Sequence, residues 1–84
     1  YAEGLRMNLT IAREVDTRGM ACPLPILKAK KALTEIGSGE LIKVVATDPS
    51  SVRDFQAFAR QTGNELIEQS NTAQDEYIHI LRRR

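Results

Sequence analysis

Cys22 is the only cysteine of the chain, and it stands in the segment RGMACPLPIL (residues 18–27), directly before Pro23, Leu24 and Pro25. A cysteine thiolate is a nucleophile and a metal ligand. One cysteine supports no dithiol redox cycle within the chain, and together with a single histidine it supplies too few ligands for zinc. We therefore expect no metal and no cofactor. The chemistry left to a lone thiolate is to accept a group, as a persulfide or a thioester, and to hand it on.

The residues around Cys22 favour the thiolate form of its sulfur. If the helix that follows begins at Pro23, Cys22 is its N-cap, and if the helix begins at Pro25, Cys22 lies just outside it. Either position is close to the positive end of the helix dipole. Arg18 adds a positive charge nearby, and Gly19 lets the loop fold back closely. Because Pro23 and Pro25 have no N–H, they remove backbone donors that would otherwise bind the sulfur anion.

Two other interpretations of the chemistry are weaker. A free cysteine is commonly buried as a small hydrophobic residue, but Cys22 lies outside the regular apolar pattern, which favours an exposed thiol. His79 is the only histidine and stands between Ile78 and Ile80 in the last predicted strand. The alternation predicts that His79 is a solvated strand residue and not a catalytic base, so a cysteine–histidine hydrolase is not expected.

Apolar residues alternate in some segments and recur at steps of three and four residues in others, so the chain is predicted to contain four strands and two helices. The predicted order is strand 9–15, helix 23–36, strand 41–47, helix 49–62, strand 64–70 and strand 76–82. Asp48 is the expected N-cap of the second helix and Gly63 its expected C-cap, while the glycines at 37 and 39 end the first helix.

Each predicted helix has one apolar stripe. The stripes consist of Ile26, Ala29, Leu33 and Ile36 in the first helix, opposite Lys28, Lys31 and Glu35, and of Val52, Phe55, Phe58 and Ala59 in the second. A helix with a single apolar stripe packs on one partner layer only. The sequence therefore predicts an α+β two-layer sandwich with the order β-α-β-α-β-β and both helices packed on one face of the sheet. The first β-α-β unit should be right-handed, with its strands parallel.

Length and composition predict one small domain. The chain has 84 residues, a net charge of +1 and no apolar run of the length that crosses a bilayer. Residues 1–6 precede Met7 and are expected to be a cloning remnant or a flexible N-terminus, with 7–84 as a single domain. We expect a cytoplasmic monomer with no membrane contact and no direct nucleic-acid binding. The terminal arginines 82–84 are interpreted as a frayed, solvated tail.

The stretch VDTRGMACPLPILKAKKAL resembles the TusA/SirA family of small sulfur-carrier proteins, whose signature is Cys-Pro-X-Pro at the start of the first helix. The likeness continues through GSGELIKVVATDPSSVRDFQAFARQTGNEL and covers about Val15 to Arg82. The family has a Gly-Glu pair opening its second strand and an Asp-Pro pair opening its second helix, at the positions where this chain has them. This resemblance implies a four-stranded mixed sheet and a cytoplasmic sulfurtransferase.

The resemblance further implies that Cys22 carries sulfur as a persulfide. The donor protein would be a cysteine desulfurase or a rhodanese-like protein, and an acceptor protein would serve tRNA 2-thiolation, sulfur oxidation or cofactor maturation. Where TusA proper has an acidic residue between the prolines, this chain has Leu24, which leaves the pathway open. The candidate site consists of the catalytic Cys22, of supporting Arg18, Gly19, Pro23 and Pro25, and of docking candidates Met20, Leu24 and Lys28. Met20 and Leu24 have a second interpretation as caps of the core, and Lys28 as a solvated helix charge.

Two further functions compete with sulfur carriage. A non-catalytic module would bind a protein or an RNA through the open sheet face or the terminal arginines, and it gives the prolines beside Cys22 no role. A peroxide-sensing thiol is disfavoured because the chain has no second cysteine to resolve the oxidised sulfur.

Overall fold

The computed structural model describes residues 11–21, 23–72 and 74–84. Its elements are β1 (Ile11–Thr17), α2 (Leu24–Thr34), β2 (Leu41–Ala46), α3 (Ser51–Thr62), β3 (Glu65–Asn71) and β4 (Tyr77–Arg82). This order confirms the predicted β-α-β-α-β-β arrangement, with the described element ends shifted by up to two residues. Residues 1–6 and the predicted start of the first strand at Leu9 lie outside the described residues.

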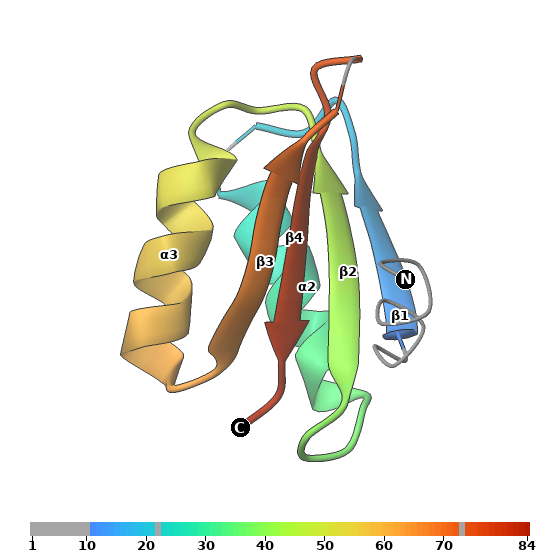
Figure 1. Cartoon of the computed structure of the whole chain (residues 1–84), viewed down its shortest axis with the longest axis vertical. Helices are drawn as coiled ribbons and strands as arrows, with labels where there is room; N and C mark the ends of the chain where they lie inside the picture. The colour runs from blue at the N-terminus through green and yellow to red at the C-terminus, as the bar shows by residue number, and fades with distance from the viewer. Residues whose placement is uncertain (1–10, 22, 73) are drawn as a thin grey trace, which may run out of the picture.

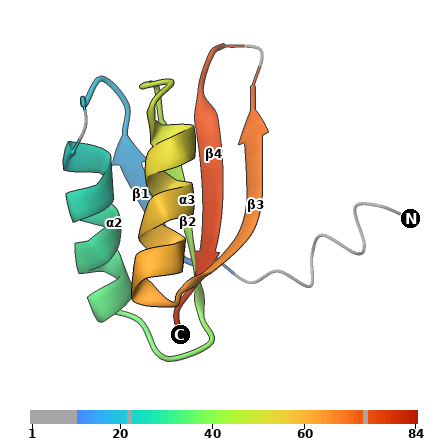
Figure 2. The ribbon, with the colours of Figure 1, turned by 90° about the vertical axis from the view of Figure 1, so that its left-hand side faces the viewer.

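The strands form one mixed sheet in the order β1-β2-β4-β3 (Figure 1). β1 and β2 are parallel, as predicted for the first β-α-β unit, whereas β4 is antiparallel to β2 on one side and to β3 on the other. Both helices lie on the same side of the sheet (Figure 2): α2 packs on β1 and β2, and α3 packs on β3 and β4. The predicted α+β two-layer sandwich is confirmed.

The core lies between the helices and the sheet. Every second residue of β2 points toward the helices, so that Ile42, Val44 and Ala46 are fully buried. The predicted helix stripes supply most of the other layer: Ala29, Leu33, Ile36, Phe55, Phe58 and Ala59 are buried, and Ile26 and Val52 are half-buried. The opposite residues Lys28, Lys31 and Glu35 are exposed, as expected from the pattern.

The start of α3 differs from the prediction. Asp48 is not the N-cap, because the helix begins at Ser51 with Ser50 in the capping position. The Asp48 carboxylate accepts a hydrogen bond from the Ser50 N–H at 3.0 Å, and the Asp48 carbonyl accepts one from the Ser51 N–H at 3.0 Å. These bonds form a separate turn before the helix, a common use of aspartate that competes with capping. The predicted C-cap is confirmed: Gly63 has φ 77° and donates to the Ala59 carbonyl.

The interpretation of His79 as a solvated strand residue is wrong. His79 is fully buried and pairs with Val44 in the sheet register, on the helix-facing side. Ile78 and Ile80 point instead to the face without helices, where they are half-buried. Alternation along a strand separates its residues into two sets but does not tell which set faces the core. The hydrogen bonds available inside the core, described below, let the polar residue take that side.

The expectation of a frayed arginine tail is also wrong. Arg82 ends β4 and forms an ion pair with Glu65 at 3.0 Å. The backbone of Arg83 pairs with Gly39 and Glu40, at 2.8 Å and 2.9 Å. These contacts hold the C-terminal residues to the end of the sheet.

Candidate functional site

Cys22 lies outside the described residues, so the site is built from the residues on either side of it. The loop before α2 leaves the carboxyl end of β1. The loop between β2 and α3 and the turn between β3 and β4 lie at the same end of the sheet (Figure 1). Chain segments far apart in the sequence thus meet around the loop that carries the cysteine.

The segment that leads to Cys22 is held against β2. The Gly19 N–H donates to Thr47 Oγ1 at 2.8 Å, and the Met20 N–H donates to the Thr17 carbonyl at 3.1 Å. Thr17 is itself buried and donates through Oγ1 to the Val45 carbonyl at 2.7 Å. Gly19 has φ 77°, a conformation that glycine adopts without strain. The prediction that Gly19 lets this loop fold back is consistent with its backbone.

Arg18 bridges two carboxylates at this end of the sheet. Its guanidinium contacts Asp16 through Nε and Nη2, both at 3.0 Å, and Glu76 of the β3–β4 turn through Nη1 at 3.4 Å. These contacts raise the pKa of Arg18 and lower the pKa of Asp16 to about 2, chiefly through the side-chain hydrogen bonds between the two. The charge of Arg18 is therefore largely balanced by its neighbours, and its support of the Cys22 thiolate stays a prediction.

The first turn of α2 presents few backbone donors. Pro23 is the N-cap residue, with no side-chain capping bond, and Pro25 occupies the second helical position. Neither proline has an N–H, and the Leu24 N–H donates to the Ala21 carbonyl at 3.0 Å. The helix starts between the two positions considered from sequence, so Cys22 directly precedes the N-cap residue along the chain. The N-terminal dipole of α2 acts here with fewer tight hydrogen bonds than most helix starts provide.

Two leucines beside the helix start are exposed. The exposed fraction is 49% for Leu24 and 54% for Leu27, and these are the exposed large hydrophobic residues of the described chain. The interpretation of Leu24 as a cap of the core is therefore excluded, whereas Met20 is half-buried and fits both of its interpretations. Leu27 was missed in the sequence. The sequence feature that could have predicted the exposure of Leu27 was its position outside the apolar stripe that includes Ile26 and Ala29.

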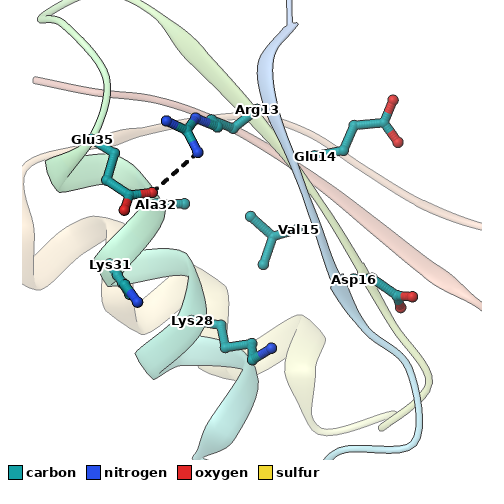
Figure 3. Close-up of a pocket in the computed structure, with 8 residues that line it drawn as sticks. All are labelled: Arg13, Glu14, Val15, Asp16, Lys28, Lys31, Ala32 and Glu35. Carbon is teal, nitrogen blue, oxygen red and sulfur yellow. Dashed lines mark ion pairs between the residues drawn. The ribbon is translucent and has the colours of Figure 1, made fainter.

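Lys28 lies on one wall of a groove between α2 and β1, with a volume of about 360 Å³ (Figure 3). Lys28 and Lys31 project from the helix, and Val15 lies on the strand side. The ion pair of Arg13 with Glu35, at 3.3 Å, spans the groove at its far end. The sequence pattern placed Lys28 and Lys31 on the exposed side of the helix but did not reveal the groove.

His79 and Ser51 form a buried pair that is unsuited to catalysis. The Gln69 amide donates to His79 Nδ1 at 3.1 Å, so the ring proton is on Nε2 and is donated to Ser51 Oγ at 2.9 Å. Burial lowers the pKa of His79 to about 4. With its proton directed at the serine and no exposure to solvent, His79 accepts no proton from Ser51. The structure agrees with the sequence in giving His79 no role as a base.

Within the described part of the chain, no set of three or more histidine, cysteine, aspartate and glutamate side chains is placed to hold a metal ion. In the same residues, neither helix has the length and apolar character needed to cross a membrane.

A family model described as sulfurtransferase TusA matches residues 13–83, which is most of the chain. The chain belongs to the TusA family. A sulfur carrier protein TusA from Allochromatium vinosum is 61% identical over 56 residues, covering 67% of this chain and 74% of that protein. A putative sulfur carrier protein from Neisseria meningitidis is 50% identical over 56 residues, covering 67% of this chain and 76% of that protein. The predicted family resemblance is confirmed.

The TusA-family domain also occurs within a longer chain. The putative sulfur carrier protein YrkF of Bacillus subtilis is 39% identical over 78 residues, which are 92% of this chain but only 40% of YrkF. Among solved structures, a SirA-like protein from Desulfitobacterium hafniense superposes with a TM-score of 0.76 at 27% identity. The superposition covers 83% of this chain and 95% of that one, which agrees with the two-layer sandwich described above.

In the Cys-Pro-X-Pro segment of this chain, Pro23 and Pro25 hold the N-cap and second helical positions of α2. The sequence analysis named these prolines, Leu24 and Lys28 as site residues, and their roles stay predictions. It missed Thr47, which holds Gly19 from a loop 28 residues away in the sequence. The only available signal was a threonine at the end of a predicted strand, because no local pattern reports such a distant contact.

Proposed function

We propose that this chain is a sulfur carrier, which accepts sulfur as a persulfide on Cys22 and passes it to an acceptor protein. Family membership supports carriage of sulfur, as do the names of the relatives. The observation that contributes most is the start of α2. Prolines at its N-cap and second helical position, with two exposed leucines on its first turn, directly follow the single cysteine of the chain.

The proposed transfer needs no external oxidant or reductant. The Cys22 thiolate attacks the outer sulfur of a donor persulfide, and a new S–S bond forms as the donor S–S bond breaks. The donor leaves as a thiolate, and Cys22 becomes a persulfide. An acceptor thiolate then attacks the outer sulfur of Cys22 and releases the Cys22 thiolate. Each step exchanges one S–S bond for another, so the electrons balance.

The carrier needs a thiolate more than it needs a general base. The N-terminal dipole of α2 stabilises an anion at this position, and the missing N–H groups of Pro23 and Pro25 limit hydrogen bonds that would reduce its nucleophilicity. His79 does not supply a base, because it is buried and its hydrogen bonds are satisfied within the core. We infer that the loop and the helix activate the sulfur through electrostatics.

The surface around the helix start is proposed as the face that partners approach. Leu24 and Leu27 are exposed apolar groups beside an exposed Lys28, and the half-buried Met20 stands two residues before Cys22 in the chain. Such a surface suits a partner with an apolar depression. The proposed donor is a cysteine desulfurase or a rhodanese-like protein. The proposed acceptor is a protein of tRNA 2-thiolation, sulfur oxidation or cofactor maturation.

Intact-protein mass spectrometry tests the proposal. After incubation with a cysteine desulfurase and cysteine, or with a rhodanese and thiosulfate, the protein should gain about 32 Da, one sulfur atom, and lose it on reduction. Cys22→Ala should gain nothing. A protein that takes up no sulfur from either donor, or that takes it up equally as Cys22→Ala, contradicts the proposal. If Cys22→Ser retained the cellular function, the chain would instead act as a non-catalytic interaction module.

A further inference from the structure

The groove between α2 and β1 combines two features that the carrier function does not use. β1 stands at the end of the sheet order β1-β2-β4-β3, so among the described strands only β2 pairs with it. The outer edge of such a strand presents N–H and C=O groups that another strand can pair with. α2 runs alongside this edge and encloses a space of about 360 Å³ with it (Figure 3).

On the helix side of the groove, the charge left outside ion pairs is positive. Of its carboxylates, Glu35 pairs with Arg13 at 3.3 Å, and Asp16 pairs with Arg18 at 3.0 Å. The side chains of Glu14 and Asp16 point away from the helix (Figure 3). Lys28 and Lys31 line the groove, and neither forms an ion pair within the described part of the chain, although the charge of Lys28 contributes to the low pKa of Asp16. The groove therefore presents two lysines to an incoming molecule.

The floor of the groove is apolar and short. Val15 from the strand and Ala32 from the helix face each other between the lysines and the far end (Figure 3). Lys28 and Glu35 are separated by roughly 10 Å along the helix axis at 1.5 Å per residue. An extended chain rises by roughly 3.3 Å per residue, so about three residues fill this length. The Arg13–Glu35 ion pair bounds one end, while the other end opens toward the start of α2.

We infer that this groove binds an extended, acidic peptide segment of a partner protein, which adds a strand to the free edge of β1. Strand addition supplies main-chain hydrogen bonds, and pockets for alternate side chains supply specificity. Two carboxylates two residues apart on one side of an extended chain are roughly 6.6 Å apart. Lys28 and Lys31 are roughly 4.5 Å apart along the helix, and their flexible stems cover the difference.

The orientation of the groove gives the bound segment a role in positioning the partner protein. Its open end is the end of α2 that directly follows Cys22 in the chain, so a segment held there brings its own protein to the face where sulfur is exchanged. This use rests on the proposed carrier function, whereas binding of the peptide does not. Cys22→Ala should therefore bind the peptide as the unchanged protein does, even if the carrier function proves wrong.

Fluorescence anisotropy with a labelled peptide, Ser-Asp-Thr-Asp-Thr-Val-Ser, tests the charge requirement. Lys28→Glu with Lys31→Glu should weaken its binding at least tenfold, and added salt should weaken binding to the unchanged protein. Lys30→Glu is the matched control, because Lys30 lies on the same helix but lines a different groove with Leu33 and Phe58. Binding that is absent at millimolar peptide, or that falls equally in the control, overturns the inference.

Methylated peptides test strand addition without changing the protein. One peptide carries methyl groups on the backbone nitrogens of both Thr residues, and a second carries them on those of the Asp and Val residues. The two peptides therefore lack N–H groups on opposite edges of the extended chain. One of the two peptides should lose at least tenfold in affinity and the other should keep it. Amide NMR shifts should change along 11–17 and 28–35. If both methylated peptides bind like the parent, the contact is electrostatic only and strand addition is excluded.

Discussion

His79 stacks on Phe55 in the core, with ring centroids 4.5 Å apart and 24° between the ring planes. The same imidazole donates to Ser51 Oγ and accepts from the Gln69 amide, so a polar residue joins α3, β3 and β4. The Gln69 amide also donates to the Val52 carbonyl at 3.0 Å. The network fixes the start of α3 against the sheet.

Stability should fall as pH falls through the range that protonates an unfolded histidine. Burial lowers the pKa of His79 from 6.5 to about 4 in the folded protein. Between these values the unfolded chain binds the proton and the folded chain does not, so the stabilisation is complete above pH 6.5 and is lost toward pH 4. The loss is at most about 1.4 kcal/mol per pH unit. Urea denaturation at pH 7, 6, 5 and 4.5 measures it.

The control for this pH dependence is His79→Gln, which removes the titrating group from the network. The low pKa of Asp16, about 2, places its own effect on stability below this range. A slope between pH 6.5 and 4.5 that is unchanged in the variant would assign the effect to other groups.

Ser51→Ala should destabilise the fold, because it leaves the buried Nε2–H of His79 without an acceptor. The cost of an unsatisfied buried donor is about 1–3 kcal/mol. Ser50→Ala is the matched control, since Ser50 is exposed and its side chain makes no capping bond. Urea denaturation should show a clear loss for Ser51 and a change within about 0.5 kcal/mol for Ser50. Equal effects would mean that the Ser51–His79 bond is not stabilising.

Thr47→Val should loosen the loop that leads to Cys22. The substitution keeps the size of the side chain and removes the oxygen that accepts from the Gly19 N–H at 2.8 Å. Hydrogen exchange should speed up at Gly19 and Met20, with a loss of stability of about 0.5–1.5 kcal/mol. Thr62→Val is the control, because Thr62 Oγ1 donates to the Phe58 carbonyl at the other end of the molecule. Exchange at Gly19 that stays slow in Thr47→Val would show that other contacts hold the loop.

Leu24→Glu and Leu27→Glu should slow sulfur transfer between proteins without unfolding the domain. Both side chains are about half exposed, so stability should change by no more than about 0.5 kcal/mol. If partners bury these leucines, transfer from a donor protein should slow by about tenfold, as expected for a lost apolar anchor. Loading of Cys22 by inorganic polysulfide, which needs no protein docking, should be unchanged in Leu24→Gln and Leu27→Gln, which remove the apolar groups without adding a negative charge beside the thiolate.

The control for the leucine variants is Gln61→Glu. Gln61 is an exposed residue near the end of α3. Protein-to-protein transfer at the normal rate in both leucine variants would remove this surface from the proposed docking face.

The sequence by itself determined the element order, the helix stripes and the position of the motif. Helical spacing in the stripe from Ala29 to Ile36, and the apolar, β-branched run around Val44, are local properties that a linear pattern records. The sequence predicted the ends of the helices and strands less accurately. Asp48 satisfied the rules for a cap, but it lies two residues before the Ser50 cap, and its carboxylate closes a turn with the Ser50 N–H.

Only the tertiary structure decided which face of β4 is buried. In the sequence, Ile78 and Ile80 are better candidates for the core than His79. In the fold, Ser51 from a helix and Gln69 from another strand satisfy both imidazole nitrogens, which removes most of the cost of burying a polar ring. The groove between α2 and β1 was likewise not predictable from the sequence, because it depends on the position of β1 at the edge of the sheet. Contacts between residues far apart in the chain leave no local periodicity, and so these features arise only when the chain is folded.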